Sequence, residues 1–361
     1  MTRVSKRSLP AGRRVITVSD IHGNLPYLRG LLAKLGFSDG DMLIVDGDFL
    51  EKGTQSLDTL RFIMRLCEKG VCWVVRGNCD GWHQILGGNM DGFIMDYMLR
   101  RPDCVLRQMC RSQGLEVDAG TPLETVKSLL RAHFADEMDF LASLPIAIDT
   151  EEHTFVHGGI SSRDMLEREP WRCMKNDDFL GQGLSFDKWQ IVGHWPVALY
   201  REDICCSEPI ILPERHIASI DGGCVLMDDG QLNALIIEPG CEGFAAEHYD
   251  GFPVMRALDA QSASERSFYI RWNDSAVEPL SESGGFTRCR HVRTGYVMDV
   301  PSERVRPDGR GGFTASDCTD YRLPVAPGDA LSVVYSTDRW HFCKKNGVSG
   351  WYSGRLAPLG E

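Results

Sequence analysis

The sequence contains no apolar run long enough to cross a membrane. A spanning helix needs roughly 18 or more apolar residues in a row, and no hydrophobic stretch of this 361-residue chain approaches that length. The N-terminal segment is basic but no apolar segment follows it, so we expect no signal peptide. Internal repeats and low-complexity tracts are absent as well. These absences predict an ordinary globular protein without a membrane-bound segment.

A cysteine pattern typical of a disulfide framework or a zinc finger is also missing. The 13 cysteines are odd in number and include no Cys-x-x-Cys pair. Most lie in apolar runs, where a free thiol behaves as a small hydrophobic side chain. This usage predicts a reducing compartment, and we expect the cytoplasm.

The sequence also lacks an excess of positively charged residues. The formal net charge of -12 argues against a broad nucleic-acid-binding surface, which would need clustered Lys and Arg. Small phosphorylated substrates remain compatible with this charge, because a bound metal ion can override a negative surface locally.

The first 240 residues alternate between strand-like apolar runs and helical patterns. Strand-like runs at 15–19, 42–45 and 71–75 alternate with helical patterns at 25–35 and 57–67, which indicates an α/β sheet with parallel strands. A mostly helical segment follows at 85–143. Strands are then predicted at 146–148, 154–156, 190–192, 217–220, 225–227 and 232–237, the last two as a hairpin around Asp228-Asp229-Gly230. We place a catalytic domain at residues 12–240.

The remainder of the chain has a different composition. Residues 241–266 are mostly small and polar and are predicted to form a linker. Residues 267–361 show short β runs without a helical pattern, which predicts a small five-stranded barrel. The segment at 346–352 resembles the final hairpin of SH3-like domains. Such a module could bind a peptide partner or only pack against the catalytic domain.

Short polar motifs follow five of the predicted strands. They are Asp20-Ile21-His22-Gly23, Gly47-Asp48, Gly77-Asn78-Cys79-Asp80, His157-Gly158-Gly159 and Gly193-His194-Trp195. Because loops beyond the carboxyl ends of α/β strands converge on one crevice, we expect their polar side chains to meet. The set is Asp20, His22, Asp48, Asn78, His157 and His194. Two carboxylates, three imidazoles and one amide suit manganese, iron or zinc better than calcium.

In this order the motifs resemble the signature of the calcineurin-like metallophosphoesterase superfamily. The nearest branch is the phosphoprotein phosphatases, with bacterial Ser/Thr phosphatases and symmetrical diadenosine tetraphosphate hydrolases. The resemblance spans residues 15–237 and implies a four-layer α/β/β/α sandwich with two divalent transition-metal ions, manganese being the expected metal. It further implies the following roles: Asp20 and His22 hold the first ion, Asp48 bridges both ions, and Asn78, His157 and His194 complete the second site. A bridging hydroxide would be the nucleophile.

Two motifs depart from the pattern of that branch. Where the branch reads Gly-Asp-x-x-Asp-Arg-Gly, this chain has Glu51 in place of the second Asp and Lys52 in place of the phosphate-binding Arg. Lys keeps the positive charge but loses the bidentate fork of Arg. Cys79 stands where the branch has the His that is implied to protonate the leaving group. If Glu51 lies beside Cys79, its charge raises the pKa of the thiol and weakens it as an acid.

Four other residues are weaker candidates for a place near the substrate. His83 lies four residues after Cys79 and could supply an imidazole, and Arg76, Arg172 and Lys175 could contact phosphate. A surface position explains His83 better than a catalytic one, and a structural ion pair explains Arg76 equally well.

These features predict a metal-dependent phosphomonoester hydrolase that acts on phosphoserine, phosphothreonine or phosphotyrosine in protein. A dinucleoside polyphosphate or nucleotide hydrolase, or a phosphodiesterase, is the alternative within the same chemistry. A binding protein with an inactive phosphatase fold is the alternative of another class. The expected partners are a phosphorylated protein or small phosphoester, and a peptide for the C-terminal module.

Overall fold

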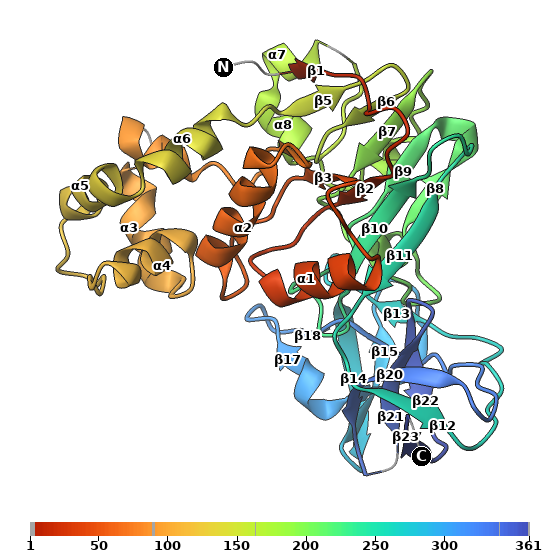
Figure 1. Cartoon of the computed structure of the whole chain (residues 1–361). Helices are drawn as coiled ribbons and strands as arrows, with labels where there is room; N and C mark the ends of the chain where they lie inside the picture. Colours follow the sequence, from red (N-terminus) through yellow and green to blue (C-terminus); the bar gives the residue numbers. More distant parts are fainter. Residues whose placement is uncertain (1–3, 89–90, 163, 339, 360–361) are drawn as a thin grey trace. The chain divides into compact units, whose positions relative to one another are not determined.

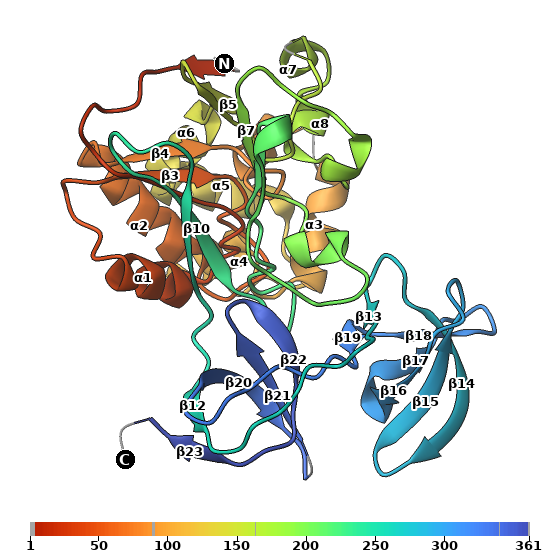
Figure 2. The ribbon, with the colours of Figure 1, turned by 90° about the vertical axis from the view of Figure 1, so that its right-hand side faces the viewer.

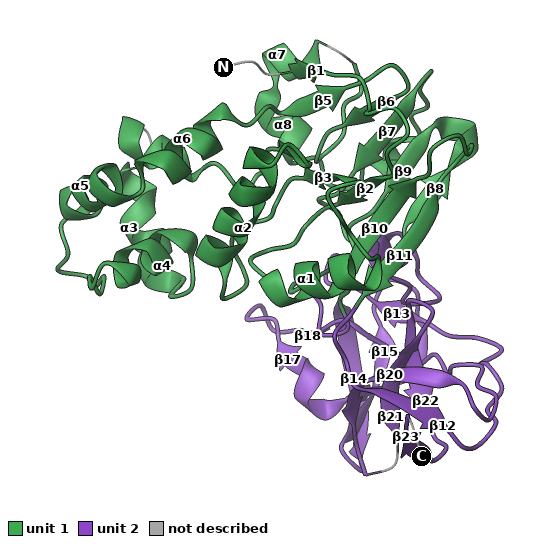
Figure 3. Ribbon diagram, viewed as in Figure 1, with its two compact units in different colours: residues 1–196, 209–226, 230–249 green, residues 197–208, 227–229, 250–361 purple. Residues whose placement is uncertain are grey.

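The computed structural model describes residues 4–88, 91–162, 164–338 and 340–359. Figure 3 colours two compact units, one formed by residues 1–196, 209–226 and 230–249 and the other by residues 197–208, 227–229 and 250–361. The second unit thus includes two short segments from within the region predicted as catalytic domain. No helix of the described residues is long and apolar enough to span a membrane.

A mixed five-stranded sheet forms the centre of the first unit. Its order is β11-β10-β2-β3-β4, with β2 (Val15–Val18), β3 (Met42–Asp46), β4 (Cys72–Val75), β10 (Leu232–Ile237) and β11 (Ala245–Tyr249). The strands β2, β3 and β4 are parallel, as predicted, and β10 pairs antiparallel with both β2 and β11. The parallel strands bring the loops that follow them to one edge of the sheet.

Helices cover one face of this sheet (Figure 1). They are α1 (Leu25–Lys34), α2 (Ser56–Glu68), η1 (Trp82–Gly87), α3 (Asp91–Arg100), α4 (Val105–Ser112), α5 (Leu123–His133) and α6 (Ala135–Ser143). In α1 the buried residues Leu25, Leu28 and Leu32 recur at helical spacing and pack into the large apolar core. The helical segment predicted at 85–143 is confirmed.

A second, six-stranded sheet lies against the other face of the first. Its order is β1-β5-β6-β7-β9-β8, with β1 (Val4–Lys6), β5 (Ala147–Asp149), β6 (His153–Phe155), β7 (Trp189–Val192), β8 (Ile210–Leu212) and β9 (Ile217–Ser219). A core that includes Ile44, Leu235, Phe155 and Ile191 joins the two sheets. The short helices α7 (Met165–Arg168) and α8 (Pro170–Met174) follow β6 in the sequence, and Figure 2 shows both of them near β7. Besides η1, the first unit contains the 3-10 turns η2 (Leu180–Gln182) and η4 (Pro213–Arg215). The 3-10 turns η3 (Val197–Tyr200) and η5 (Ser302–Arg304) belong to the second unit.

Two predictions about local structure are wrong. Residues 225–227 form turns rather than a strand, so the predicted hairpin does not exist. The run is apolar because Met227 is buried in a small cluster with Cys205 and Tyr269. The segment 241–266 is not a plain linker, because it contains β11 and β12 (Val254–Ala257). These strands are held by pairing with β10 and β20, which a polar composition does not reveal.

The second unit is rich in β-strands, but its described residues do not form one closed barrel, so the SH3-like barrel is not confirmed. One sheet has the order β16-β15-β14-β18-β17, another has the order β22-β21-β20-β12-β23, and β13 pairs with β19. The strands are β13 (Tyr269–Ile270), β14 (Ala276–Ser283), β15 (Phe286–His291), β16 (Val297–Pro301), β17 (Val305–Pro307), β18 (Phe313–Ala315), β19 (Cys318–Thr319), β20 (Ala330–Ser336), β21 (His341–Lys345), β22 (Val348–Tyr352) and β23 (Leu356–Pro358). Local sequence predicts the β21–β22 hairpin at Asn346-Gly347, both at positive φ, but not which distant strands pair.

Candidate metal centre

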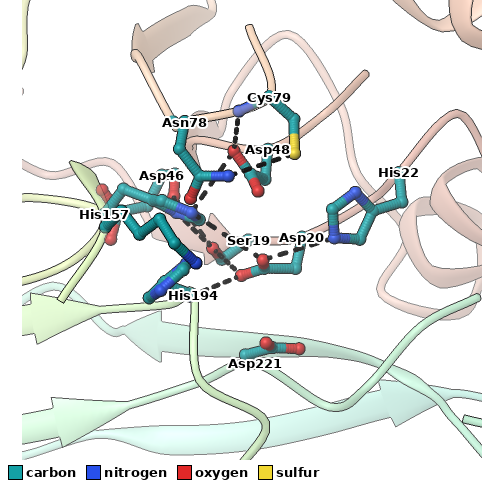
Figure 4. A network of polar contacts seen from close by, with 12 residues as sticks. Ser19, Asp20, His22, Asp46, Asp48, Asn78, Cys79, His157, His194 and Asp221 are labelled. Atoms are coloured by element: carbon teal, nitrogen blue, oxygen red, sulfur yellow. Dashed lines mark hydrogen bonds and ion pairs between the residues drawn. The ribbon is translucent and has the colours of Figure 1, made fainter. Parts of the chain in front are cut away.

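The structure brings the six predicted ligands together. Figure 4 shows Asp20, His22, Asp48, Asn78, His157 and His194 around one centre in the first unit. Asp20 and His22 follow β2, Asp48 follows β3, and Asn78 follows β4, while His157 and His194 follow β6 and β7 of the other sheet. Residues that span 175 positions of sequence therefore meet because both sheets end at the same place.

The loops that carry these side chains have strained backbones. Asp20, His22, Asp48 and His194 all have a positive φ, between 48° and 68°. Non-glycine residues adopt this conformation at a cost of about 1–3 kcal/mol each, and such strain concentrates at functional sites. At Gly77 an added Cβ would lie 2.1 Å from the Asp48 Oδ1 atom, so only glycine permits this approach.

Backbone carbonyl groups orient two of the histidine rings. His157 Nδ1 donates to the Asp46 carbonyl oxygen at 2.8 Å, and His22 Nδ1 donates to the Leu50 carbonyl oxygen at 3.2 Å. Each ring therefore turns its Nε2 toward the centre, where His22 Nε2 lies 3.6 Å from Asp20 Oδ1. Histidines that bind metal are held in this way, with the other ring nitrogen donating to a carbonyl or carboxylate.

Several buried polar atoms at the centre have no hydrogen-bond partner. They are Asp20 Oδ1, Asn78 Oδ1 and His157 Nε2. A buried polar atom without a partner costs about 1–3 kcal/mol, so native proteins rarely keep several of them in one place. All three atoms are metal-ligating types, and a bound cation would satisfy them together.

Two overlapping groups of side chains have the spacing of metal ligands. In the groups His22, Asp48, Cys79 and Asp48, His157, His194, one ligand atom per residue lies within 4.8 Å of the others. Asp48 belongs to both groups, as a bridging carboxylate would. The residues present therefore fit two ions, and the thiol of Cys79 faces the same space as the first of them.

Buried carboxylates crowd this centre and disfavour one another's charge. Burial raises the pKa of Asp20 to about 6 and that of Asp46 to about 8. Burial, together with the charge of Asp48, raises the pKa of Asp80 to about 8. Burial alone would also raise the pKa of Asp48, but the charge of His157, whose Nε2 lies 3.4 Å from Asp48 Oδ1, outweighs it and holds the pKa far below its usual value. Cations would relieve this repulsion.

Asp80 and Asp177 have roles that the sequence did not reveal. The Asp80 carboxylate accepts hydrogen bonds from the backbone amides of Asp48, Leu50 and Gly77, so it fastens the second motif to the third. Asp177 Oδ1 lies 2.7 Å from His194 Nε2 and orients that ring. Asp80 is the last residue of the third motif, so its position offered a signal, whereas no motif in the sequence includes Asp177.

Cys79 lies against the carboxylate of Asp48. Its backbone amide donates to Asp48 Oδ1 at 2.7 Å, and Asn78 Nδ2 lies 3.2 Å from its sulfur. Burial, and then the charge of Asp48, raises the pKa of the thiol well above its usual value. The thiol is thus a weak acid at neutral pH, for a different reason than the one expected.

Glu51 does not act on Cys79 in the way the sequence suggested. Its carboxylate accepts hydrogen bonds from the Tyr97 hydroxyl at 2.6 Å and from the backbone amide of Val105 at 3.0 Å. These bonds tie the second motif to α3 and to the first residue of α4. Lys52, the third catalytic candidate, is exposed and makes no ion pair among the described residues.

The weaker candidates have structural partners or unfavourable environments. Arg76 donates to the Leu144 carbonyl oxygen, and Arg172 and Lys175 lie on the surface beside Glu169 and Asp177. Burial, and then the charge of Arg76, lowers the pKa of His83 to about 4, so its imidazole is neutral at neutral pH.

Residues 13–217 match the model of the calcineurin-like phosphoesterase family. This match covers more than half of the chain, and the chain belongs to that family. It is a metallophosphoesterase, a hydrolase of a family whose members use a dinuclear metal centre.

The chain is also similar to individual proteins. It is 33% identical over 82 residues to a bis(5'-nucleosyl)-tetraphosphatase (asymmetrical) of Bacillus subtilis, across 20% of this chain and 34% of that protein. It is 26% identical over 239 residues to the enzyme of the same name from Geobacillus thermodenitrificans, across 60% of this chain and 88% of that protein. The solved structure of a cold-active protein-tyrosine phosphatase of a psychrophilic Shewanella species matches 70% of this chain and 81% of its own length, at 19% identity and a TM-score of 0.42. The first curated relatives are matched over only about a third of their length.

Proposed function

We propose that this metallophosphoesterase hydrolyses a nucleoside polyphosphate. In this proposal the leaving group departs as an anion, and no side chain of the protein donates a proton to it. The observation that carries the proposal is the position of Cys79. A thiol of raised pKa lies against Asp48, where the related phosphatases place an imidazole acid. A nucleoside phosphate leaves as a stable anion and needs no such acid, whereas a serine alkoxide gains about 10²–10⁴-fold in rate from one.

The names of relatives support the same substrate class. Several curated relatives of this chain are bis(5'-nucleosyl)-tetraphosphatases, which cleave a phosphoanhydride. In this substrate a water molecule attacks one phosphorus, the bridging P–O bond breaks, and a nucleoside phosphate departs with the bonding electron pair.

We assign the six clustered side chains to metal binding. Asp20 and His22 would hold one ion, Asp48 both, and Asn78, His157 and His194 the other. When bound, the ions would stabilise charge on the phosphoryl group and activate water. Asp80 and Asp177 keep the ligand loops and the His194 ring in place, and Lys52 offers a single positive charge to a phosphate oxygen.

Protein phosphatase activity is the second candidate, and Cys79 restricts its form. A tyrosine phenolate is a far better leaving group than a serine alkoxide. We therefore expect phosphotyrosine to be the favoured phosphoamino acid if the enzyme acts on proteins.

A comparison of substrates tests the proposal. The full-length chain, loaded with manganese, should hydrolyse diadenosine tetraphosphate fastest, phosphotyrosine peptide and p-nitrophenyl phosphate more slowly, and phosphoserine peptide slowest. Equal rates on the phosphoserine and phosphotyrosine peptides would show that another acid serves the leaving group and would contradict the proposal.

A further inference from the structure

A pocket opens beside the loop that follows Asp48, outside the cluster of candidate metal ligands. It has a volume of about 660 Å³, and its lining includes Glu51, Lys52, Phe93, Tyr97, Arg100 and Arg101. The first two belong to the second motif, and the others belong to α3 and the residue after it. All lie in the first unit.

Two features place this pocket next to the candidate metal centre. Lys52 lines the pocket four residues after Asp48, and the backbone amide of the adjacent Gly53 donates to the His22 carbonyl oxygen at 2.8 Å. A row of aromatic rings also runs from the third motif into the pocket. Trp82 lies 4.8 Å from Tyr97, and Tyr97 lies 5.3 Å from Phe93, between ring centroids. A molecule with its phosphate at the metal centre could therefore extend into the pocket.

The pocket has unpaired positive charge. Lys52 and Arg101 make no ion pair among the described residues, although the Arg101 guanidinium lies 5.9 Å from the centroid of the Tyr97 ring. Arg100 is neutralised by Asp96. Two acids also line the pocket: Glu51 is 1% exposed and accepts hydrogen bonds from Tyr97 and Val105, and Asp103 is paired with Arg111. The pocket thus favours an anion.

The pocket also has an exposed aromatic surface. Phe93 is 47% exposed, which is unusual for a large apolar side chain that faces a pocket. Its ring and that of Tyr97 could stack against a flat ligand ring, and the adjacent Arg101 adds a planar cation. Anion sites and a stacking surface side by side suit a molecule that carries both phosphate and a base.

We propose that this pocket binds the part of a nucleoside polyphosphate that lies beyond the bond being broken. Lys52 and Arg101 hold the phosphoryl group next to the scissile bond, and a base stacks on Phe93 and Tyr97. Glu51 is a positioning residue, because its bonds to Tyr97 and Val105 fix the pocket to the catalytic loop. This assignment rests on the proposed function and names the residues that make the enzyme select a nucleotide.

Two exposed substitutions with matched controls test the assignment. Phe93→Ala removes the stacking ring, and Leu99→Ala on the same helix removes another exposed apolar side chain that does not line the pocket. Arg101→Gln removes the unpaired cation, and Arg131→Gln removes a cation of α5 that is paired with Glu124. The measurements are kcat and KM of the manganese-loaded chain on diadenosine tetraphosphate, inorganic tripolyphosphate and p-nitrophenyl phosphate.

The pattern of KM values distinguishes the roles. Phe93→Ala should raise KM for diadenosine tetraphosphate by about tenfold, as expected for one base–aromatic stack, and should leave tripolyphosphate unchanged. Arg101→Gln should raise KM for both polyphosphates and not for p-nitrophenyl phosphate. Neither control should change any KM. An unchanged KM for diadenosine tetraphosphate in Phe93→Ala, or an equal rise for p-nitrophenyl phosphate, would overturn the assignment.

A binding measurement separates failure of the pocket from failure of the proposed function. Calorimetry of the manganese-loaded chain with a methylene-bridged, non-hydrolysable ATP analogue should detect binding that Phe93→Ala weakens and Leu99→Ala does not. Such binding without turnover of any nucleotide would support the assignment of the pocket as a nucleotide site and would refute the proposed function. Turnover of diadenosine tetraphosphate with no effect of Phe93→Ala on either measurement would support the proposed function and refute the assignment of the pocket. Arg101-dependent hydrolysis of an acidic phosphopeptide, with no nucleotide binding, would assign the pocket to proteins and overturn our proposal.

Discussion

At the scale of single residues, Cys79 distinguishes this centre from that of the phosphatases it resembles. Its sulfur lies 3.2 Å from Asn78 Nδ2, and its backbone amide donates to Asp48 Oδ1, so the residue is part of the cluster of candidate metal ligands. A thiol with a raised pKa gives up its proton less readily than an imidazolium ion does. The choice of leaving group is therefore the property that this residue should control.

We predict that Cys79→His narrows the preference for good leaving groups. An imidazole at this position can protonate an alkoxide, so hydrolysis of a phosphoserine peptide should rise by about tenfold or more, within the range known for positioned acids. Hydrolysis of p-nitrophenyl phosphate should change little, because nitrophenolate needs no proton. Cys79→Ala serves as the control and should leave the phosphoserine rate as low as in the wild type. A fall of both rates in Cys79→Ala would instead indicate that the thiol binds a metal ion.

The crowded carboxylates predict that metal-free protein becomes less stable as the pH rises. The folded-state pKa values of Asp20, about 6, and of Asp46, about 8, lie above the unfolded value of 3.8. Groups shifted in this direction contribute stability below the unfolded pKa and lose it as the pH rises through the folded pKa. The midpoint of thermal unfolding of the chelated chain should therefore fall from about pH 4 to about pH 8, with the contribution of Asp20 lost by about pH 6 and that of Asp46 by about pH 8. Manganese should raise the midpoint and flatten this dependence, and the same slope with and without metal would contradict the prediction.

At the scale of elements, one carboxylate joins a catalytic loop to two helices. Glu51 is held at φ 69° and accepts hydrogen bonds from Tyr97 of α3 and from the start of α4. A negative charge at a helix N-terminus is favourable, and the bond to Val105 also satisfies one of the free amide groups there. This contact joins α3 and α4 to the loop that carries Asp48.

Tyr97→Phe tests this coupling. The change removes the hydroxyl donor to Glu51 and keeps the aromatic ring, so a buried carboxylate oxygen loses its partner. We expect a loss of about 1–3 kcal/mol in the free energy of unfolding and a higher KM for diadenosine tetraphosphate, with kcat on p-nitrophenyl phosphate unchanged. Urea unfolding and steady-state kinetics give the two values. The matched change Tyr249→Phe, on β11, should leave the KM for diadenosine tetraphosphate unaltered.

Sequence patterns could predict the elements that carry the metal ligands, but not what the other residues contact. The runs before Asp20, Asp48 and Asn78 are short, apolar and separated by helices, so parallel strands and a common loop edge follow from general rules. The partner of Glu51 lies 46 positions further along, in a helix whose packing no local pattern encodes. For the same reason the sequence could not show that Glu51 bonds to Tyr97 and Val105, and Arg101, which lines the pocket beside Glu51, was not among the predicted residues.

At the scale of the whole molecule, the second unit is assembled from three separate stretches of the chain. Segments 197–208 and 227–229 belong to it although they lie between strands of the catalytic unit in sequence. Cys205 and Met227 from these segments are buried with Tyr269, and Cys206 forms a β-bridge with Val348. The sequence division at residue 240 could not show this, because it followed composition rather than contacts.

A chain that ends after Tyr249 should consequently be less stable than the full chain. Its segments 197–208 and 227–229 would lose the residues that bury them, and each large apolar side chain left exposed removes about 1.5–3 kcal/mol of burial energy. We expect a lower midpoint of thermal unfolding and increased binding of a hydrophobic dye. A monodisperse shortened chain with an unchanged midpoint and no dye binding would show that the two segments do not need residues 250–361.

The central claim is that six side chains from two sheets form one centre for two metal ions. The most direct test is the metal content of the purified full-length chain after incubation with manganese and removal of free metal, measured by elemental analysis with a quantified protein concentration. We predict two ions per chain in the wild type, one in His194→Ala, and fewer than one in Asp48→Asn, because Asp48 belongs to both ligand groups. One ion per wild-type chain, unchanged in His194→Ala, would contradict the two-ion centre.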